Sequence, residues 1–204
     1  MGSINKASQK SYIESEIKKT SHVLGLIVSD QDFIKNIENI VASIVKSFKS
    51  GGKVFLAGNG GSAADAQHIA GEFVSRFMFV RPGLPAIALT TDTSILTAVG
   101  NVYGYEHVFS RQIDALANKG DVFFAYSTSG QSKNILNALQ HAKNKEVICI
   151  GLTGNKGGVM KEFCDYIVEI PSSETPHIQE GHLVIGHIIC GLVESIIFKK
   201  ESDA

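Results

Sequence analysis

The chain has 204 residues, a length that suits one α/β domain, so we expect a single domain over residues 1–204. Its 19 lysines and arginines balance 20 aspartates and glutamates without a dense basic run, which argues against nucleic acid as the main partner. It has no signal-peptide core and no uninterrupted run of about 18 apolar residues, so we expect a cytoplasmic protein without a membrane partner.

Two amphipathic helices are predicted before the first strand. Apolar residues recur at helical spacing over residues 9–27 and over about 30–49, where the apolar face is unusually broad. A face that wide usually packs against more than one neighbour. Because these helices precede the first strand, we expect residues 9–50 to contribute to a subunit interface as well as to cover the sheet.

From residue 53 onward, short apolar segments alternate with helical ones. The expected strands are residues 54–57, 86–89, 122–126, 147–151 and 166–170. The expected helices are residues 62–77, 93–99, 104–117, 133–143, 157–163 and 176–198. This alternation indicates an α/β fold, a three-layer αβα sandwich around a five-stranded parallel sheet. Ligands of such sheets bind at the carboxyl ends of strands, where the strand order reverses.

The first strand leads into a turn of sequence GNGG at residues 58–61. Glycines let the backbone turn sharply and approach a ligand, and the free N–H groups of the following helix favour an anion. In that helix, His68 and Glu72 are four residues apart and therefore share a face. The first hypothesis is a phosphorylated ligand beside groups that can move protons or bind a metal.

A second polar loop, STSGQS at residues 127–132, follows the expected strand 122–126. Its hydroxyl groups, its glycine and the start of the next helix suit phosphate oxygens. Taken alone, it is equally consistent with a serine cap and an ordinary polar loop. Neither loop matches the P-loop or the dinucleotide-binding pattern, so no motif supports a nucleotide cofactor.

The last predicted helix carries further candidates. Gln179 and His187 are eight residues apart and fall roughly on one face, whereas His182 lies off that line. For any one histidine here, a hydrogen-bonded structural role outweighs a functional one. The joint occurrence of His68, Glu72, Gln179 and His187 with two phosphate-type loops favours a functional site.

The cysteines Cys149, Cys164 and Cys190 lie far apart in apolar settings. This spacing offers neither a paired metal motif nor a disulfide framework. We therefore predict buried free thiols in a reducing compartment.

Five ordered segments together resemble the phosphoheptose isomerases of the sugar isomerase (SIS) domain superfamily. They are GNGGSAADAQHIAGEF, ALTTDTSILTAVGNVYGYEHVFSRQ, YSTSGQS, TGNKGG and IQEGHLVIGHIICGLVE. The resemblance implies a flavodoxin-like SIS fold and the conversion of D-sedoheptulose 7-phosphate to D-glycero-D-manno-heptose 7-phosphate, the first step of bacterial heptose biosynthesis. It also implies a homotetramer with active sites at subunit interfaces. One Zn²⁺ per subunit is implied too, with its catalytic or structural role left open.

The same resemblance implies individual site residues. Glu72 and His187 match the family's acid/base pair, and His68, Glu72, Gln179 and His187 match its metal ligands. The positions that match substrate contacts are Asn59, Gly60, Gly61, Ser62, Asp65, Glu72, Asn101, Ser127, Thr128, Ser129, Ser132 and Gln179. At Val102 the chain departs from the family, which usually has aspartate there. Loss of that carboxylate leaves sugar hydroxyls unpaired at a cost of about 1–3 kcal/mol, and weaker binding or a different sugar would follow.

Two alternatives remain open at the level of sequence. A non-catalytic SIS protein that binds a sugar phosphate or a replication initiator needs the phosphate loops but not the acid/base pair, so the presence of Glu72 and His187 favours an enzyme. The second alternative is an isomerase of another sugar phosphate, such as an arabinose or hexose phosphate. For an isomerase, we expect Glu72 to abstract the proton next to the carbonyl and His187 to transfer protons at the sugar oxygens through an enediol.

Overall fold

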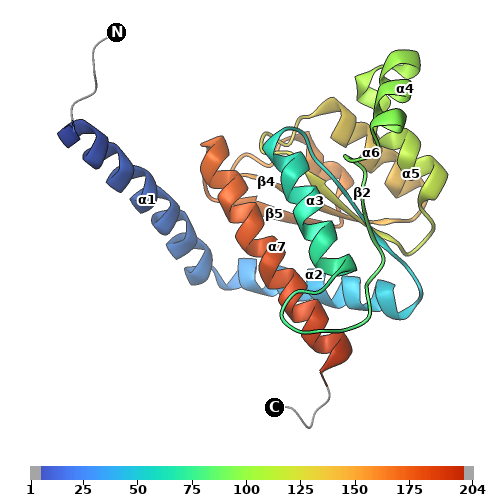
Figure 1. The fold of residues 1–204 in the computed structure, drawn as a ribbon, viewed down its shortest axis with the longest axis horizontal. Coiled ribbons are helices and arrows are strands. Elements are labelled where there is room, and N and C mark those ends of the chain that lie inside the picture. The colour runs from blue at the N-terminus through green and yellow to red at the C-terminus, as the bar shows by residue number, and fades with distance from the viewer. Residues whose placement is uncertain (1–5, 200–204) are drawn as a thin grey trace.

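The computed structural model describes residues 6–199 and contains five parallel strands with helices on both faces (Figure 1). The strands are β1 (Val54–Ala57), β2 (Ala86–Ala88), β3 (Val122–Tyr126), β4 (Ile148–Gly154) and β5 (Tyr166–Ile170). They lie in the order β2-β1-β3-β4-β5, which is the flavodoxin-like order with its reversal between β1 and β3. The predicted αβα sandwich is confirmed.

The helices are α1 (Lys6–Ser29), α2 (Gln31–Lys49), α3 (Gly61–Val74), α4 (Thr93–Tyr103), α5 (Ser110–Leu116), α6 (Lys133–Asn144) and α7 (Thr175–Phe198). The helix expected over 62–77 ends at Val74, the helix expected over 93–99 continues to Tyr103, and two further expected helices are wholly or partly 3₁₀. The helix expected over 104–117 is a 3₁₀ turn, η1 (Tyr105–His107), followed by α5, because the chain turns Val108 and Phe109 into the core between them. The helix expected over 157–163 is a shorter 3₁₀ segment, η2 (Val159–Phe163).

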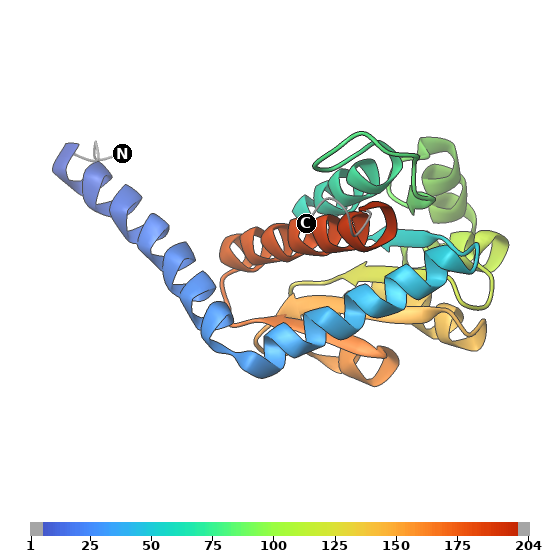
Figure 2. The ribbon, with the colours of Figure 1, turned by 90° about the horizontal axis from the view of Figure 1, so that it is seen from below.

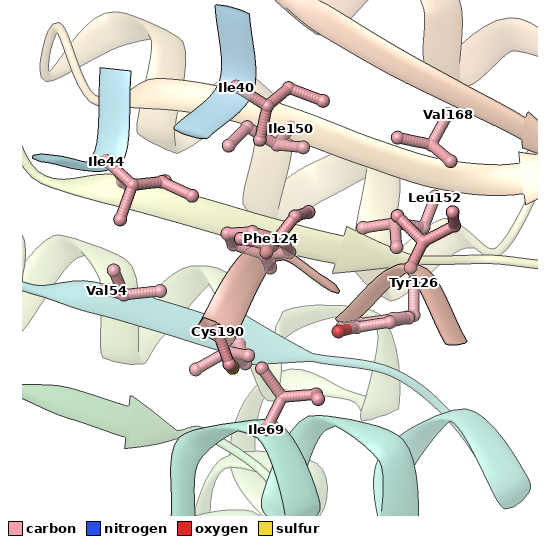
Figure 3. Packing of buried hydrophobic residues seen from close by; sticks show 14 of the residues in the cluster. Ile40, Ile44, Val54, Ile69, Phe124, Tyr126, Ile150, Leu152, Val168 and Cys190 are labelled. Carbon is pink, nitrogen blue, oxygen red and sulfur yellow. The ribbon is translucent and has the colours of Figure 1, made fainter. Parts of the chain in front are cut away.

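Alternate side chains of each strand enter two separate cores, as expected for a sheet covered on both faces. Val54 and Leu56 of β1 belong to the core under α2, α3 and α7, and Phe55 belongs to the core under α5 and α6. Figure 3 shows the first core, where Ile40 of α2 and Ile69 of α3 belong to one cluster with Phe124 of β3 on the same face of the sheet. The sheet that carries the loops at its strand ends is therefore packed on both faces.

Strand β4 extends three residues beyond the predicted end and begins one residue later. The added residues Leu152, Thr153 and Gly154 pair with Val168, Glu169 and Ile170 of β5. The glycine at 154 looks like a strand end in the sequence. Backbone hydrogen bonding to β5 continues the strand through Gly154. Local strand propensity cannot predict this pairing, because β5 is a separate segment of the chain.

The second helix has the broad apolar face that its sequence predicts. Asp30 caps its start by accepting a hydrogen bond from the Phe33 N–H at 2.9 Å. The helix contacts both α7 and β5, which confirms packing against more than one neighbour. In contrast, α1 extends away from the sheet (Figure 2) and buries only Val23 and Ile27 among its described residues.

Among the described residues, α7 is the one helix long and apolar enough to cross a membrane by length and composition. Within its most apolar window, 44% of the residues are buried inside the protein. Polar residues such as His182 and Glu194 interrupt it, so the expected absence of an uninterrupted apolar run holds. Because core helices of water-soluble proteins pass the same test, the finding is weak support for a membrane span.

All three cysteines are free, as predicted. Cys149 and Cys190 are buried as predicted, whereas Cys164 is only half-buried. Burial raises the pKa of the Cys149 thiol to about 12. A thiol in that environment is an inert packing group at neutral pH.

A polar cluster joins the middle of α1 to the start of α7. The His177 Nδ1 atom lies 2.9 Å from a Glu180 carboxylate oxygen, and its Nε2 atom lies 3.3 Å from Glu16. The Thr20 hydroxyl donates to the same Glu180 oxygen at 2.6 Å. Lys19 forms an ion pair with Glu16 at 3.1 Å. The charge of the Glu16 carboxylate is therefore balanced by side chains of the protein.

The contact between α1 and α7 is expected to depend on pH. The hydrogen bond to Glu180 raises the pKa of His177 and outweighs the opposing effect of burial. The stabilisation is therefore complete below the ordinary imidazole pKa of about 6.5 and is lost as pH rises through the raised value. Amide hydrogen exchange in α1, corrected for intrinsic rates, should be faster at about pH 8.5 than at about pH 6. An equal increase of the α1 exchange rate between these two pH values in a His177→Gln variant would contradict the assignment of the pH dependence to His177.

Candidate active site

The glycine turn and the serine loop follow β1 and β3, which are neighbouring strands at the reversal of strand order. They lie at the same edge of the sheet and line one open cavity of about 460 Å³. Of the predicted substrate contacts, eight line this cavity: Asn59, Gly60, Gly61, Ser62, Ser127, Thr128, Ser132 and Gln179. The structure thus places the two loops where the sequence expects a phosphate site.

Local hydrogen bonds shape the serine loop. The Ser127 and Ser132 hydroxyl oxygens lie 2.9 Å apart, and Ser132 is the N-cap residue of α6. Gly130 has a φ of +65°, a conformation that side chains disfavour, and its N–H donates to the Ser127 carbonyl at 2.9 Å. The loop therefore gathers hydroxyl groups and the first N–H groups of α6 around one point, as an anion site requires.

The sequence analysis missed Asn134, which joins the glycine turn to the first turn of α6, directly after the serine loop. Its side-chain amide pairs reciprocally with that of Asn59, through N–H to O contacts of 2.8 and 3.0 Å. Asn134 is buried in the first turn of α6, two residues after Ser132. An asparagine at that position in the sequence gives no sign of its partner, because the pair spans 75 residues.

The acid/base candidates Glu72 of α3 and His187 of α7 lie within 4.8 Å of each other, and His68 contacts both of them. The Nε2 atoms of His68 and His187 are 2.9 Å apart, and His68 Nε2 is 3.2 Å from a Glu72 oxygen. A Cβ at Gly186 would lie 2.6 Å from an Ile69 carbon, so this glycine permits the close approach of the two helices. The ring of His187 also stacks on Phe77, with centroids 5.5 Å apart.

The side chains of His68, Glu72 and His187 have the donor set of a zinc site. Their ligand atoms all lie within 4.8 Å of one another. Tetrahedral zinc with bonds of about 2.0–2.1 Å separates its ligand atoms by about 3.3 Å, close to the contacts found here. The Gln179 amide contacts the start of α3, where its Nε2 donates to the Ser62 hydroxyl at 3.3 Å. The three residues therefore fit the metal that the resemblance implies, and Gln179 as a fourth ligand stays a prediction.

Behind the cavity lies a group of buried polar atoms. Asp65 Oδ2, Tyr126 Oη and His182 Nδ1 have no hydrogen-bond partner among the described residues. Burial raises the pKa of Asp65, against the opposing charge of His68. Burial also lowers the pKa of His182 to about 4, so this ring is neutral at physiological pH. His182 is a packed structural histidine, consistent with its position off the line of Gln179 and His187.

The remaining predicted contacts lie elsewhere. Ser129 lines a neighbouring cavity of about 220 Å³ together with Lys156. Asn101 and Val102 are exposed on α4, a helix with no buried residue in this single chain. The inclusion of Asn101 in the site stays a prediction, and so does the effect of Val102 on sugar binding.

Comparison with known proteins decides the family. The SIS domain model matches residues 21–154. The chain is 60% identical to a phosphoheptose isomerase of Burkholderia pseudomallei (strain 1710b), covering 93% of this chain and 96% of that protein. It is 57% identical, with the same coverage, to a phosphoheptose isomerase of Aneurinibacillus thermoaerophilus.

The chain belongs to the phosphoheptose isomerases of the SIS domain family.

A solved phosphoheptose isomerase from Neisseria gonorrhoeae has the same fold, with a TM-score of 0.86 at 35% identity over 92% of this chain and 99% of that one. The family resemblance seen in the sequence is therefore confirmed. The SIS fold explains why the glycine turn and the serine loop meet, since both follow strands at the reversal of the sheet.

Proposed function

We propose that this phosphoheptose isomerase family member converts D-sedoheptulose 7-phosphate to D-glycero-D-manno-heptose 7-phosphate through an enediol. The observation that carries the proposal is the contact of a carboxylate and two imidazoles on α3 and α7, with Gln179 of α7 lining the phosphate-type cavity. The product would enter bacterial ADP- or GDP-heptose biosynthesis in the cytoplasm.

The phosphoryl group is held by the serine loop in this proposal. Ser127, Thr128, Ser129 and Ser132 supply hydroxyl donors, and the start of α6 supplies backbone N–H groups. Asn59 and the glycines beside it bind the sugar chain. This arrangement orients the carbonyl end of the substrate toward α3 and α7, which carry the proton-transfer groups.

Aldose–ketose isomerisation moves one proton between neighbouring carbons and one between neighbouring oxygens. We assign the carbon proton to Glu72, which removes it from the carbon next to the carbonyl and returns it to the adjacent carbon. His187 carries the proton between the two oxygens. The enediol forms when the first carbon–hydrogen bond breaks and is consumed when the new one forms, so the reaction needs no external oxidant or reductant.

Zinc would be held by His68, Glu72, Gln179 and His187, one ion per subunit, and when bound it supplies polarisation of the sugar oxygens. A metal-bound carboxylate is a weaker base. Tight metal binding therefore opposes proton abstraction by Glu72. Turnover of chelator-treated enzyme, measured before and after zinc is added, shows which of the two effects dominates.

We also propose that residues 1–204 form one SIS domain that assembles into a homotetramer with active sites at subunit interfaces. The support is exposed apolar surface. On α1, Tyr12, Ile13 and Ile17 are 67%, 58% and 65% exposed. On α7, a stripe of four apolar residues recurs every fourth position and is also exposed: Val184, Ile188, Leu192 and Ile196. Patches of this kind mark protein contacts.

Sedimentation velocity is expected to give a particle of four chains at micromolar concentration. An Ile13→Asp and Ile17→Asp double variant should weaken assembly, because it introduces charge into the apolar face of α1. A matched change on the polar side, Lys18→Asp, should leave the particle intact. A monomeric wild-type protein would contradict the tetramer.

The function is tested by incubating the purified protein with sedoheptulose 7-phosphate, with chelator or with added zinc, and following aldose formation by NMR. We expect the heptose 7-phosphate to accumulate, and inorganic phosphate to compete for the serine loop. Absence of product under every condition would favour a sugar-phosphate-binding protein. Turnover of arabinose or hexose phosphates alone would identify a different isomerase.

A further inference from the structure

A fully buried ion pair lies behind the acid/base group. Arg81 Nε lies 2.9 Å from Glu194 Oε1, and the two side chains are only 2% and 1% exposed. Glu194 also accepts hydrogen bonds from the backbone N–H groups of Phe77 and Met78, at 2.8 and 2.7 Å. Burial would raise the pKa of Glu194, but these donors and the guanidinium hold it below its usual value. Glu194 is therefore ionised at neutral pH, and burial excludes water as an alternative hydrogen-bond partner for either side chain.

The guanidinium of Arg81 is bonded to the end of the helix that carries Glu72. One terminal nitrogen donates to the Glu72 carbonyl at 2.8 Å, and the other donates to the Phe73 carbonyl at 2.7 Å. These carbonyls belong to the last turn of α3, where the helix leaves its acceptors unpaired. Arg81 thus holds the backbone of the proposed base itself.

The carboxylate of the pair belongs to the helix that carries His187. Glu194 follows His187 by seven residues, about two turns of α7, so both project from the same side of the helix. The Phe77 N–H that Glu194 accepts belongs to the residue whose ring stacks on His187, at an interplanar angle of 29°. One ion pair therefore connects the Glu72 backbone, the His187 helix and the ring that packs against His187.

We propose that Arg81 and Glu194 are positioning residues that fix the separation of Glu72 and His187. The inference rests on the proposed isomerase function. The pair touches neither the serine loop nor the glycine turn in the described contacts, so it sets the geometry of proton transfer and leaves phosphate binding unchanged. Its loss is expected to lower kcat and to leave KM nearly constant.

Glu194→Gln is the main test, because glutamine has nearly the same shape, removes the charge and keeps an acceptor for only one of the two backbone N–H groups. The chain offers a matched control in Asp121→Asn. Asp121 is also buried, and it accepts from the N–H groups of Lys53 and Asn118 and from the Lys53 ammonium. It lies immediately before β3, at the opposite end of the sheet from the serine loop. The two variants lose the same kind of interaction at different distances from the site.

We expect Glu194→Gln to lower kcat by about tenfold to a hundredfold with KM within about twofold, because small displacements of reacting groups cost rates of this size. Asp121→Asn should keep kcat within about twofold at a comparable loss of melting temperature. Arg81→Lys keeps the positive charge but loses the planar guanidinium with its several N–H donors, so it should reproduce the kcat loss. It replaces Glu194→Gln as the test if that variant does not fold. Equal kcat losses in the Glu194 and Asp121 variants, or unchanged kcat in Glu194→Gln and Arg81→Lys, would overturn the proposal.

A second readout does not depend on catalysis. In chelator-treated protein labelled with ¹⁵N-histidine, the ring signals of His187 should move in Glu194→Gln and Arg81→Lys and stay at their wild-type positions in Asp121→Asn. If the wild-type protein isomerises no sugar phosphate, the proposed function has failed, and the ring signals alone decide the positioning role. Unmoved His187 signals in both site variants would then overturn it.

Discussion

Replacing Glu72 with glutamine is expected to lower turnover of sedoheptulose 7-phosphate by about a hundredfold or more with the fold intact. Glutamine has nearly the same shape and keeps an oxygen that can face His68, 3.2 Å away in the wild type. It cannot accept the proton next to the carbonyl. His187→Ala should cause a loss of similar size, because it removes the group that moves protons between the oxygens. NMR assays of product formation measure both.

The control for these substitutions is a histidine on another element. His141 of α6 pairs with Asp114 at 2.8 Å and lies apart from the cavity-lining residues. His141→Ala should retain nearly full turnover, and circular dichroism should be unchanged in all three variants. Near-normal turnover in both Glu72→Gln and His187→Ala would refute the acid/base assignment.

Gly130→Ala is expected to destroy the phosphate site and to lower stability. A Cβ at this position would overlap the Gly157 carbonyl and lie 2.9 Å from the Gly158 nitrogen. Because these are backbone atoms, no side-chain rotation can relieve the overlap. Its φ of +65° adds about 1–2 kcal/mol of conformational strain for a side chain. The serine loop must therefore shift, and KM should rise at least about tenfold as the phosphate contacts are lost, a change equal to about 1.4 kcal/mol.

Gly120→Ala separates backbone strain from steric overlap. Gly120 has a φ of +84°, but a Cβ there would meet no atom within 4 Å. This variant should lose stability by about 1 kcal/mol with KM unchanged, as measured by thermal unfolding and steady-state kinetics. Equal effects of the two substitutions on KM would show that the serine loop does not depend on the close approach at Gly130.

Most of the fold follows from local sequence patterns. The bounds of β1, β3 and β5 agree with the predicted segments residue for residue, because a short apolar run between polar turns has few other ways to be buried. The order of motifs also places the two loops at strand ends. The proximity of His68 and Glu72 follows from helix geometry alone, since four residues make about one turn.

The sequence by itself determined the elements, the sheet class and the family. Tertiary structure alone decided which distant groups meet. The extension of β4 through Gly154, the amide pair of Asn59 with Asn134, and the ion pair of Arg81 with Glu194 all join segments far apart in the chain. Periodicity and turn chemistry depend only on residues that are close in the sequence. A buried polar side chain is stabilised by a partner that can be distant in the sequence, and the two meet only when the chain folds.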